Sequence, residues 1–486
     1  MGRPTRRSRV GLRASRRLAA VLASAAVAGC SMNPATGKKE LNFYSEDQEI
    51  AMGLQAAQQT ATETGTYEDT AWARYVTGLG KQLAATSERP QLPWTFTVVD
   101  DPEVNAFALP GGYIFVTRGI LASVNSEAEL SGVMGHEIGH VTARHGATQM
   151  SRAQLAQMGL GLGTVLRPDL AQYAGAVSQG LQLLFLKYTR DDETQADMLG
   201  FRYSVRAGYD PHSMLDLFTM LEGVESLSGQ GRLPSWATTH PFPENRQAHV
   251  QRMLDSAKVD YAALARDREP YLQRLEGMVY GADPRQGYFD GQTFYHPELR
   301  FQVVFPAGWR TTNGFSAVTG LTEQQDGLAQ LGLAGKEPPA TQLTTFLQQA
   351  GVHPGATSTA SVNGLPTVSA QFTAEMQQGT AQGYIAFIQY GGVTYRLMAM
   401  ATTAQAAAYD QVMRNWIGSF RPLTDPARLG VKPMRIHLVR LAAPMRVAVF
   451  SQKYPSAVPI ERVAMINGVP VDGSLPAGLA KQVVSR

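Results

Sequence analysis

Residues 136–140 read His-Glu-Ile-Gly-His, and no other feature constrains the local structure and chemistry of the chain as strongly. On a helix, four residues make about one turn, so the two imidazoles project from the same face. They can then bind one metal ion, with Zn–N distances of about 2.0–2.1 Å. Glu137 can reach the open side of the metal and accept a proton from bound water. A chance match is expected in roughly one chain in a hundred or fewer.

The residues before this motif predict the helix that the motif requires. Ser126 and Glu129 have the spacing of a capping box, in which Ser is the N-cap and Glu stands three residues later. We expect the helix to run to about Arg144. On such a helix His145, nine residues after His136, would lie about 180° around the axis and point away from the metal.

A catalytic zinc needs a third protein ligand and an open fourth position. The spacing that places a third histidine soon after the motif is absent, because Ala143 and Gly146 stand where Gly and His would be needed. The acid-rich segment 190–197 begins another predicted helix, on which Glu193 and Asp197 share one face at a spacing of four. The alternative is that acids at this end only complement the helix dipole, which fits the first two acids of the segment.

The first 29 residues are typical of a signal peptide. An Arg-rich part, 1–17, precedes the short apolar run Leu18–Gly29, which is too short to span a bilayer permanently. The formal net charge of +3 includes seven Arg of this segment, and without them it is −4. The composition therefore gives no reason to propose a nucleic-acid partner.

This segment ends in Val-Ala-Gly followed by Cys30, which looks like a bacterial lipobox. In such signals the chain is cleaved before the Cys, which is then acylated, and the acyl chains anchor the protein to a membrane. Ser31 follows, which favours the outer membrane by resemblance to lipoproteins of Gram-negative bacteria. The alternative is a stray thiol in a discarded leader. Cys30 is the only Cys, so no disulfide can form within the chain.

The patterning predicts an α+β multidomain protein. The expected parts are a polar tether at 30–45, a mainly helical domain with a small hairpin or sheet at 46–282, an α+β domain at 288–422 and a small unit at 434–486. In the first domain we expect helices at 46–62, 68–87, 126–144, 190–207, 211–225 and 244–280, strands at 94–99 and 113–117, and mostly helical residues at 150–190 with Gly-rich interruptions near 159–163. Later we expect strands at 300–305, 366–374, 382–390 and 393–401 and a helix at 404–418.

Four separated motifs resemble the gluzincins related to HtpX and the CAAX-prenyl proteases, and above all their periplasmic BepA-like (YfgC-like) members. They are the His-Glu-Ile-Gly-His motif, Glu-Thr-Gln-Ala-Asp at 193–197, the block 105–112, and Thr239-His240-Pro241 with Arg246. The resemblance covers roughly residues 31–260. It implies that Glu193 is the third zinc ligand and that Asp197 orients a ligand imidazole or another site residue.

The resemblance implies one Zn²⁺ per chain and peptide-bond hydrolysis, with Glu137 as the general base. A developing oxyanion needs a second stabiliser besides zinc, and His240 and Arg246 are the candidates. Two alternatives remain for His240. It can be a turn residue before proline, or it can occupy the fourth zinc position and keep the resting enzyme inhibited.

The block before and after the Gly-Gly pair predicts where a substrate binds. Gly111 and Gly112 let another backbone approach closely, and Tyr113–Thr117 could offer an edge for strand addition. Asn105 begins this block. The alternative is an ordinary hairpin. A protease that binds substrate at a strand edge would favour unfolded chains, and the resemblance implies outer-membrane proteins that failed to assemble.

The C-terminal half carries two further resemblances. Residues 288–422 look like a small PsbP/Mog-type α/β sandwich. Residues 434–486 resemble a βααβ LysM module, although the usual Gly-Asp-Thr near its start is missing. Peptidoglycan contact and a bare protein-interaction role are therefore both open. His296, His353 and His437 are isolated and expected in surface or packing roles.

Together these features predict a periplasmic zinc endopeptidase, lipid-anchored, that acts in envelope protein quality control. One alternative is a lipoprotein chaperone or scaffold whose metal site is latent. The other is a peptidoglycan-associated hydrolase.

Overall fold

The computed structural model describes residues 30–166, 188–227, 236, 240, 246–376 and 379–485, without the side chains of Cys30 and of residues 156–166. The chain divides into two compact units. The first comprises Met1–Gln58, Glu68–Val98 and Val104–Tyr271, and the second comprises Gln59–Tyr67, Val99–Glu103 and Leu272–Arg486.

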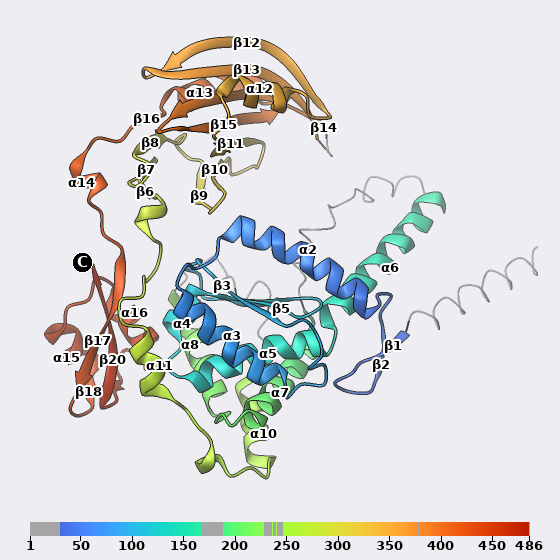
Figure 1. The fold of residues 1–486 in the computed structure, drawn as a ribbon, viewed down its shortest axis with the longest axis vertical. Helices are drawn as coiled ribbons and strands as arrows, with labels where there is room; N and C mark the ends of the chain where they lie inside the picture. The colour runs from blue at the N-terminus through green and yellow to red at the C-terminus, as the bar shows by residue number, and fades with distance from the viewer. Residues whose placement is uncertain are drawn as a thin grey trace, which may run out of the picture. The chain divides into compact units, whose positions relative to one another are not determined.

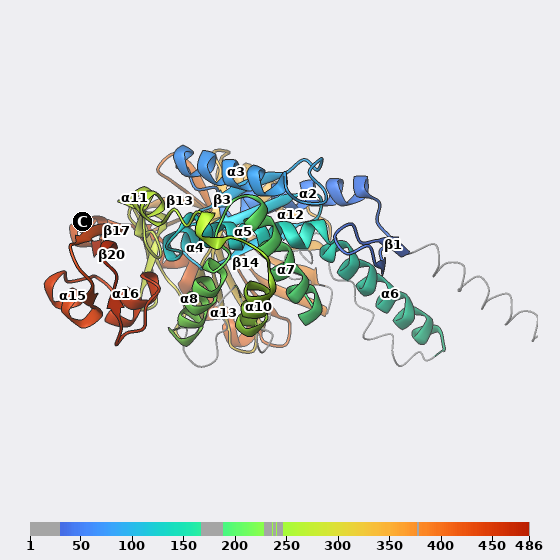
Figure 2. The same cartoon turned by 90° about the horizontal axis from the view of Figure 1, so that it is seen from below.

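The first unit is mainly helical with a three-stranded sheet (Figure 1). Its strands are β1 (Cys30–Met32), β2 (Lys39–Leu41), β3 (Thr95–Val99), β4 (Ala106–Leu109) and β5 (Tyr113–Thr117). Its helices are α2 (Glu46–Thr64), α3 (Thr70–Ala84), α4 (Arg118–Ser123), α5 (Glu127–Thr142), α6 (His145–Leu166), α7 (Arg190–Arg206), α8 (Ser213–Leu227), α10 (Arg246–Ser256) and α11 (Arg268–Arg274). The ends of α2, β3 and α11 belong to the second unit. In Figure 2, α7, α8 and α10 lie side by side, in agreement with their contacts.

The helix α5 lies in the core of this unit. Its N-cap is Ser126, whose Oγ accepts a hydrogen bond from the backbone N–H of Glu129, while the Glu129 carboxylate accepts one from the backbone N–H of Asn125. The predicted N-cap at Ser126 is therefore confirmed, and the carboxylate of Glu129 bonds the residue before the N-cap instead of the N-cap backbone. All residues from Ala128 to Thr142 are buried, so α5 is held by packing on every side.

A pair of glycines determines how closely α5 and α7 approach. A Cβ on Gly200 would lie 2.9 Å from the backbone nitrogen of His136, and one on Gly135 would lie 3.1 Å from the Cα of Gly200. Since only glycine lacks a Cβ, the two backbones can pass at this distance. The crossing brings the acidic face of α7 against the histidines of α5.

The three-stranded sheet corrects one prediction. Its order is β3-β5-β4, so Tyr113–Thr117 is the central strand and cannot offer a free edge. The reason is that β3 pairs with one side of β5 and β4 pairs with the other, with Leu109 opposite Tyr113. All five residues of β5 are buried. In the described sheet, β4 has one partner strand and is an edge.

Three other expectations for the first unit differ from the structure. The segment 30–45, expected to be a tether, contains the two-stranded hairpin of β1 and β2. The helix α6 continues through 159–163, where we expected interruptions. Between residues 246 and 280 the structure describes two separate α-helices, α10 and α11, and a 3-10 helix at Tyr261–Ala263, instead of continuous helical structure.

The second unit contains a seven-stranded antiparallel sheet with the order β12-β13-β14-β15-β11-β10-β9, and a four-stranded sheet with the order β16-β8-β7-β6. The strands are β6 (Tyr288–Asp290), β7 (Thr293–His296), β8 (Phe301–Val304), β9 (Arg310–Asn313), β10 (Ala317–Leu321), β11 (Gly327–Gly335), β12 (Val352–Val362), β13 (Leu365–Met376), β14 (Gly379–Tyr390), β15 (Val393–Thr402) and β16 (Arg421–Pro422). The helices here are α12 (Pro339–Leu347), α13 (Ala406–Gly418) and α14 (Pro426–Leu429). The strands expected at 300–305, 366–374, 382–390 and 393–401 and the helix at 404–418 are confirmed.

The helices α12 and α13 pack on opposite faces of the seven-stranded sheet. On β14, Ala386 and Ile388 join the core cluster that contains α13, whereas Ile385 and Phe387 join the cluster that contains α12. Successive side chains of a strand point to opposite faces, so this alternation explains why both faces of β14 are apolar.

The last part has the element order strand, helix, helix, strand. The long strands β17 (Met434–Leu441) and β20 (Gly478–Ser485) pair antiparallel, as do the short strands β18 (Met445–Arg446) and β19 (Ser474–Leu475). Between them lie α15 (Val447–Lys453) and α16 (Ile460–Ile466). Residues 277–280 pair with the start of β17, and both segments belong to the second unit. Among the helices that the structure describes, none combines the length and apolar character of a membrane span.

Candidate metal centre

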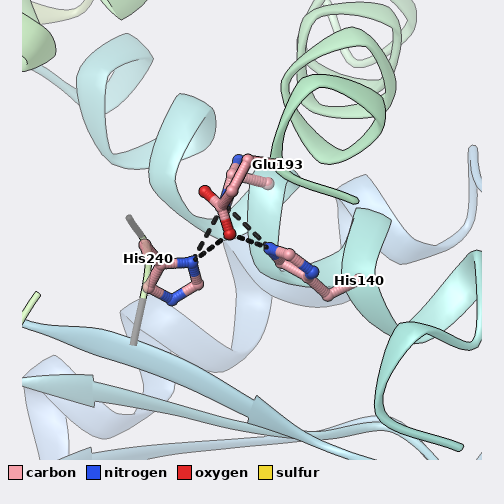
Figure 3. A group of neighbouring side chains, drawn as sticks. His140, Glu193 and His240 are labelled. Carbon is pink, nitrogen blue, oxygen red and sulfur yellow. Dashed lines mark hydrogen bonds and ion pairs between the residues drawn. The ribbon is translucent and has the colours of Figure 1, made fainter. Parts of the chain in front are cut away.

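Four buried side chains converge at the crossing of α5 and α7. His136 and His140 come from α5, Glu193 from α7, and His240 from a separate segment, and one ligand atom of each lies within 4.8 Å of the others. Figure 3 shows the Glu193 carboxylate between His140 and His240. The structure thus brings together the three predicted ligands and the histidine predicted to act beside them.

The distances within this group fit one metal ion. His136 Nε2 lies 3.0 Å from His140 Nε2, 3.4 Å from His240 Nδ1 and 3.5 Å from Glu193 Oε2. Glu193 Oε1 lies 3.4 Å from His140 Nε2 and 3.0 Å from His240 Nδ1. Ligands of tetrahedral zinc with bonds of about 2.0–2.1 Å lie about 3.3 Å apart. Two histidines, a carboxylate and a third histidine are also donors that a divalent transition metal prefers.

The far side of His136 contacts a carboxylate. His136 Nδ1 lies 2.9 Å from Asp197 Oδ1, and Arg246 Nε donates to Asp197 Oδ2 at 2.8 Å. A carboxylate accepts, so Nδ1 carries the proton and Nε2 faces the other ligands. Arg246 is buried against this carboxylate and over the ring of Phe218, so its position favours a supporting role over the oxyanion role that we predicted.

The far side of His140 contacts His145, and this corrects the prediction that His145 points away. The two Nδ1 atoms are 2.9 Å apart, and both rings are buried. The prediction assumed one straight helix, but α5 ends at Thr142 and Arg144 has a φ of 60° before α6 begins. The turn returns His145 to the rear of His140.

Glu137 is fully buried, and neither of its oxygens has a hydrogen-bond partner among the described residues. Its nearest ionic neighbour is His240, whose Nε2 lies 3.5 Å from Oε1. Burial raises the pKa of Glu137 to about 8. A carboxyl with this pKa, free of structural hydrogen bonds, can take up and release a proton near neutral pH.

The ligand groups differ in their pKa shifts. Burial alone would raise the pKa of Glu193, but His240, His136 and His140 lower it well below the ordinary value. Burial lowers the pKa of His140 well below its usual range, whereas Asp197 and Glu193 overcome burial and raise that of His136. The shifts of Glu193 and His140 therefore favour the anionic carboxylate and the neutral imidazole that metal ligation requires, whereas the shift of His136 favours its protonated ring.

Aromatic rings hold two of the imidazoles, and the sequence pattern did not single them out. Trp236 stacks on His240 with ring centroids 4.4 Å apart, and its carbonyl accepts the backbone N–H of His240 at 2.8 Å. Tyr188 stacks on His140 at 3.8 Å. Both lie close in sequence to a ligand, Tyr188 five residues before Glu193 and Trp236 four before His240, and that proximity was the available signal.

A model of peptidase family M48 matches residues 71–254, a range that includes all four converging groups. The mitochondrial metalloendopeptidase OMA1 of Schizosaccharomyces pombe is 30% identical over 238 residues, which are 46% of this chain and 67% of that protein. This chain belongs to peptidase family M48. The predicted resemblance to BepA-like metalloproteases is confirmed.

Two further relatives match a smaller share of their own length. The beta-barrel assembly-enhancing protease of Yersinia pestis is 30% identical over 252 residues, 49% of this chain and 50% of that protein. The mitochondrial metalloendopeptidase OMA1 of Bos taurus is 35% identical over 175 residues, 34% of each chain. The chain thus spans half or less of these two proteins. With the buried His and Glu group, these matches show a metalloprotease domain, a hydrolase of peptide bonds.

The predicted substrate-binding residues of the M48 domain lie around the turn between β4 and β5. Gly111 has a φ of 81°, and a Cβ there would lie 2.5 Å from the Cα of Ile50 on α2. The structure therefore explains this glycine by the close packing of α2, and a substrate backbone is not needed to account for it. Gly112 has a φ of 106°, and Tyr113 is buried against Gly53 of the same helix.

Asn105, another predicted substrate-binding residue, immediately precedes β4, at the end opposite the Gly-Gly turn. The backbone N–H of Asn105 donates to Thr117 Oγ1, and the buried Asn105 Oδ1 has no partner among the described residues. A cavity of about 10 Å³ is lined in part by Ala108, Leu109, His140 and Tyr188, so the second half of β4 borders a metal ligand.

Cys30 is the first residue of β1. Thr239 and Pro241 lie outside the described residues.

Proposed function

We propose that this chain is a zinc endopeptidase of the bacterial periplasm that cleaves unfolded or misassembled envelope proteins. The observation that carries the proposal is the buried convergence of His136, His140 and Glu193, with Glu137 beside them. One Zn²⁺ per chain fits the spacing of these donors. The family supports the reaction class, and the names of the bacterial relatives support the kind of substrate.

In this proposal His136, His140 and Glu193 hold the zinc. The bound ion would acidify its water and polarise the scissile carbonyl. Glu137 accepts the proton of the attacking water and delivers it to the leaving amine, which is general acid–base work by one carboxyl. Its burial and its raised pKa of about 8 support this role, because a base with a pKa near the working pH transfers protons in both directions.

We further propose that His240 occupies the fourth position of the resting centre. Its Nδ1 is as close to Glu193 and His136 as a ligand would be, and stacking on Trp236 holds the ring there. A substrate carbonyl must then displace His240, which would afterwards lie close enough to assist as an oxyanion donor. Removal of this imidazole by His240→Ala would relieve the inhibition but remove that donor.

The edge for substrate binding is β4 in this proposal. Unlike β5, β4 has one partner strand among the described elements, and it packs against α5. A substrate strand paired with it would run along the helix that carries Glu137, and main-chain hydrogen bonds would favour unfolded chains of many sequences. Misassembled outer-membrane barrel proteins fit this requirement.

The location and further partners extend the proposal. Acylation of Cys30 would anchor the protein to a membrane, and two or more acyl chains give stable attachment. Ser31, the residue that follows, favours the outer membrane. The strand-helix-helix-strand order of residues 434–485 supports a LysM-like module there, whose partner would be peptidoglycan or another protein.

A single pair of variants tests the chemistry. Zinc-loaded wild type, Glu137→Gln and Glu127→Gln are incubated with an unfolded outer-membrane barrel protein, and zinc content and cleavage are measured. We expect Glu137→Gln to keep its zinc and to lose at least about 100-fold in kcat/KM. Glu127→Gln, on the same helix, should match wild type.

Full cleavage by Glu137→Gln, or no cleavage by zinc-loaded wild type, would refute the endopeptidase. In the second case, suppression of substrate aggregation by the wild type would identify a chaperone. Release of muropeptides from purified sacculi would instead identify a peptidoglycan hydrolase.

A further inference from the structure

Three polar residues behind His140 form a continuous line of hydrogen bonds that the proposed mechanism does not use. His145 Nδ1 lies 2.9 Å from His140 Nδ1, and His145 Nε2 lies 2.7 Å from Gln195 Oε1. Asn33 Nδ2 donates to the same Gln195 oxygen at 3.2 Å. His145 is 1% exposed and Asn33 is 2% exposed, whereas Gln195 between them is partly exposed.

The direction of the hydrogen bond between Asn33 and Gln195 follows from the backbone groups that Asn33 contacts. Asn33 Oδ1 accepts from the backbone N–H groups of Ala35 and Thr36, at 2.9 and 3.3 Å, in the turn between β1 and β2. A backbone N–H can only donate, so the other atom of this amide is the nitrogen. Asn33 Nδ2 therefore donates to Gln195, and the Gln195 atom that receives this bond is its oxygen.

The remaining bonds have one consistent direction. Because Gln195 Oε1 only accepts, His145 Nε2 carries the proton and donates to it. In a neutral imidazole the other nitrogen then accepts, so His145 Nδ1 receives the proton of His140 Nδ1. The Nε2 of His140, which faces His136 and Glu193, is left with a lone pair.

We propose that Asn33, Gln195 and His145 are positioning residues that hold the proton of His140 on Nδ1 and so present Nε2 to the metal. The inference rests on the proposed metal centre and adds residues that touch neither metal nor substrate. The relay runs from the turn between β1 and β2, through Gln195 on α7 and His145 at the start of α6, to His140 on α5. Its three side chains are uncharged, and two carboxylates lie beside them: Glu40 Oε1 accepts from Asn33 Nδ2 at 2.9 Å, and Asp192 Oδ1 lies 3.9 Å from His145 Nε2.

The tautomers themselves are the first test. Long-range proton–nitrogen correlation spectra of histidine-labelled, metal-free wild type at neutral pH distinguish the two neutral forms of each ring. We expect His140 protonated on Nδ1 and His145 protonated on Nε2. The opposite assignment for either ring would overturn the proposal, whatever the enzyme does.

Variants of Gln195 are the second test, with zinc affinity measured by competition against a chelating dye. Gln195→Met keeps the size of the side chain but cannot accept, and we expect zinc affinity to fall about tenfold. Gln195→Glu keeps an accepting oxygen and should restore the wild-type affinity and tautomers. The matched control is Gln149→Met on α6, whose Nε2 donates to Asp192 outside the relay, and it should bind zinc as the wild type does.

The outcomes separate this inference from the proposed function. Equal zinc affinity for Gln195→Met and Gln149→Met, or no recovery in Gln195→Glu, overturns the relay even if the protein is a protease. If Gln195→Met does not fold, the Gln195→Glu comparison and the tautomers of the wild type decide. A wild type that binds no zinc would refute the metal centre, and the tautomer spectra would still decide the relay.

Discussion

The two histidines of the metal-binding motif are supported in different ways. Behind His136 stands the charged pair of Asp197 and Arg246. Behind His140 stands a neutral imidazole, His145, followed by amide groups. Both supports include α7 residues, and the rings they hold are one helical turn apart on α5. The same metal centre therefore has one electrostatic support and one that transmits only hydrogen-bond direction.

This difference matches the opposite pKa shifts of the two rings, raised for His136 and lowered for His140. A hydrogen bond to a charged group is roughly twice as strong as a neutral one. Removal of one partner from a buried charged pair costs about 3–5 kcal/mol, against about 1–3 kcal/mol for a neutral buried group left unsatisfied. The His136 side should therefore dominate stability and affinity.

Asp197→Asn should break the stronger support and give the largest effect. Arg246 would lose its charged partner, and His136 would lose the carboxylate that holds its proton on Nδ1. We expect the metal-free protein to lose about 3–5 kcal/mol of unfolding free energy, and zinc affinity to fall by about 10- to 100-fold. Urea denaturation in chelator and a competition titration measure the two quantities.

The matched control for this variant is Asp191→Asn, an exposed acid in the first turn of the same helix. It should change stability by less than about 1 kcal/mol and leave zinc affinity unchanged. If Asp197→Asn costs no more zinc affinity than Gln195→Met, charge is not what distinguishes the two supports, and the comparison fails.

The sequence predicted the directly acting residues better than their supports. The spacing of His136 and His140 and the capping box implied the helix, and the spacing of Glu193 and Asp197 implied a shared face. These signals are local, because they depend on residues within two turns of one helix. They were sufficient for the pair of His136 and His140, whereas the choice of Glu193 as third ligand and the role of Asp197 rested on the family resemblance.

The family resemblance implied the support of His136 by Asp197, but the support of His140 was missed, because it depends on distant segments and on one unusual backbone angle. Arg144 has a positive φ, which no pattern of apolar residues predicts, and it turns His145 back to His140. The bond between Asn33 and Gln195 joins residues 162 positions apart. The central place of β5 likewise depends on its pairing with β3, which a hairpin pattern does not reveal.

Gly200→Ala should weaken both supports together by a smaller amount. A Cβ at this position would lie 2.9 Å from the backbone nitrogen of His136, so α7 must move away from α5. We expect a loss of about 1–3 kcal/mol of unfolding free energy, with a fall in zinc affinity because Asp197 and Gln195 shift with the helix. Denaturation and titration are again the measurements.

Gly78→Ala is the matched control, since a Cβ there meets nothing within 4 Å and Gly78 lies inside the helix α3. That variant should gain up to about 1 kcal/mol and bind zinc normally. If the histidine spectra of Gly200→Ala show a changed tautomer at only one of the two rings, the two supports do not move as one body.

Ser126→Ala should have the smallest effect. It tests whether the stability of α5 as a whole, and not the hydrogen bonds behind each ring, determines zinc affinity. The Ser126 hydroxyl caps α5 by accepting the backbone N–H of Glu129 at 3.1 Å, ten residues before His136. Its removal should cost about 1 kcal/mol of unfolding free energy. Zinc affinity of the folded protein should stay within about twofold of wild type, because neither imidazole support touches the cap. If zinc affinity instead falls as far as in Gln195→Met, the orientation of both rings comes from the helix as a whole, and the contrast between a charged and a neutral support has no functional meaning.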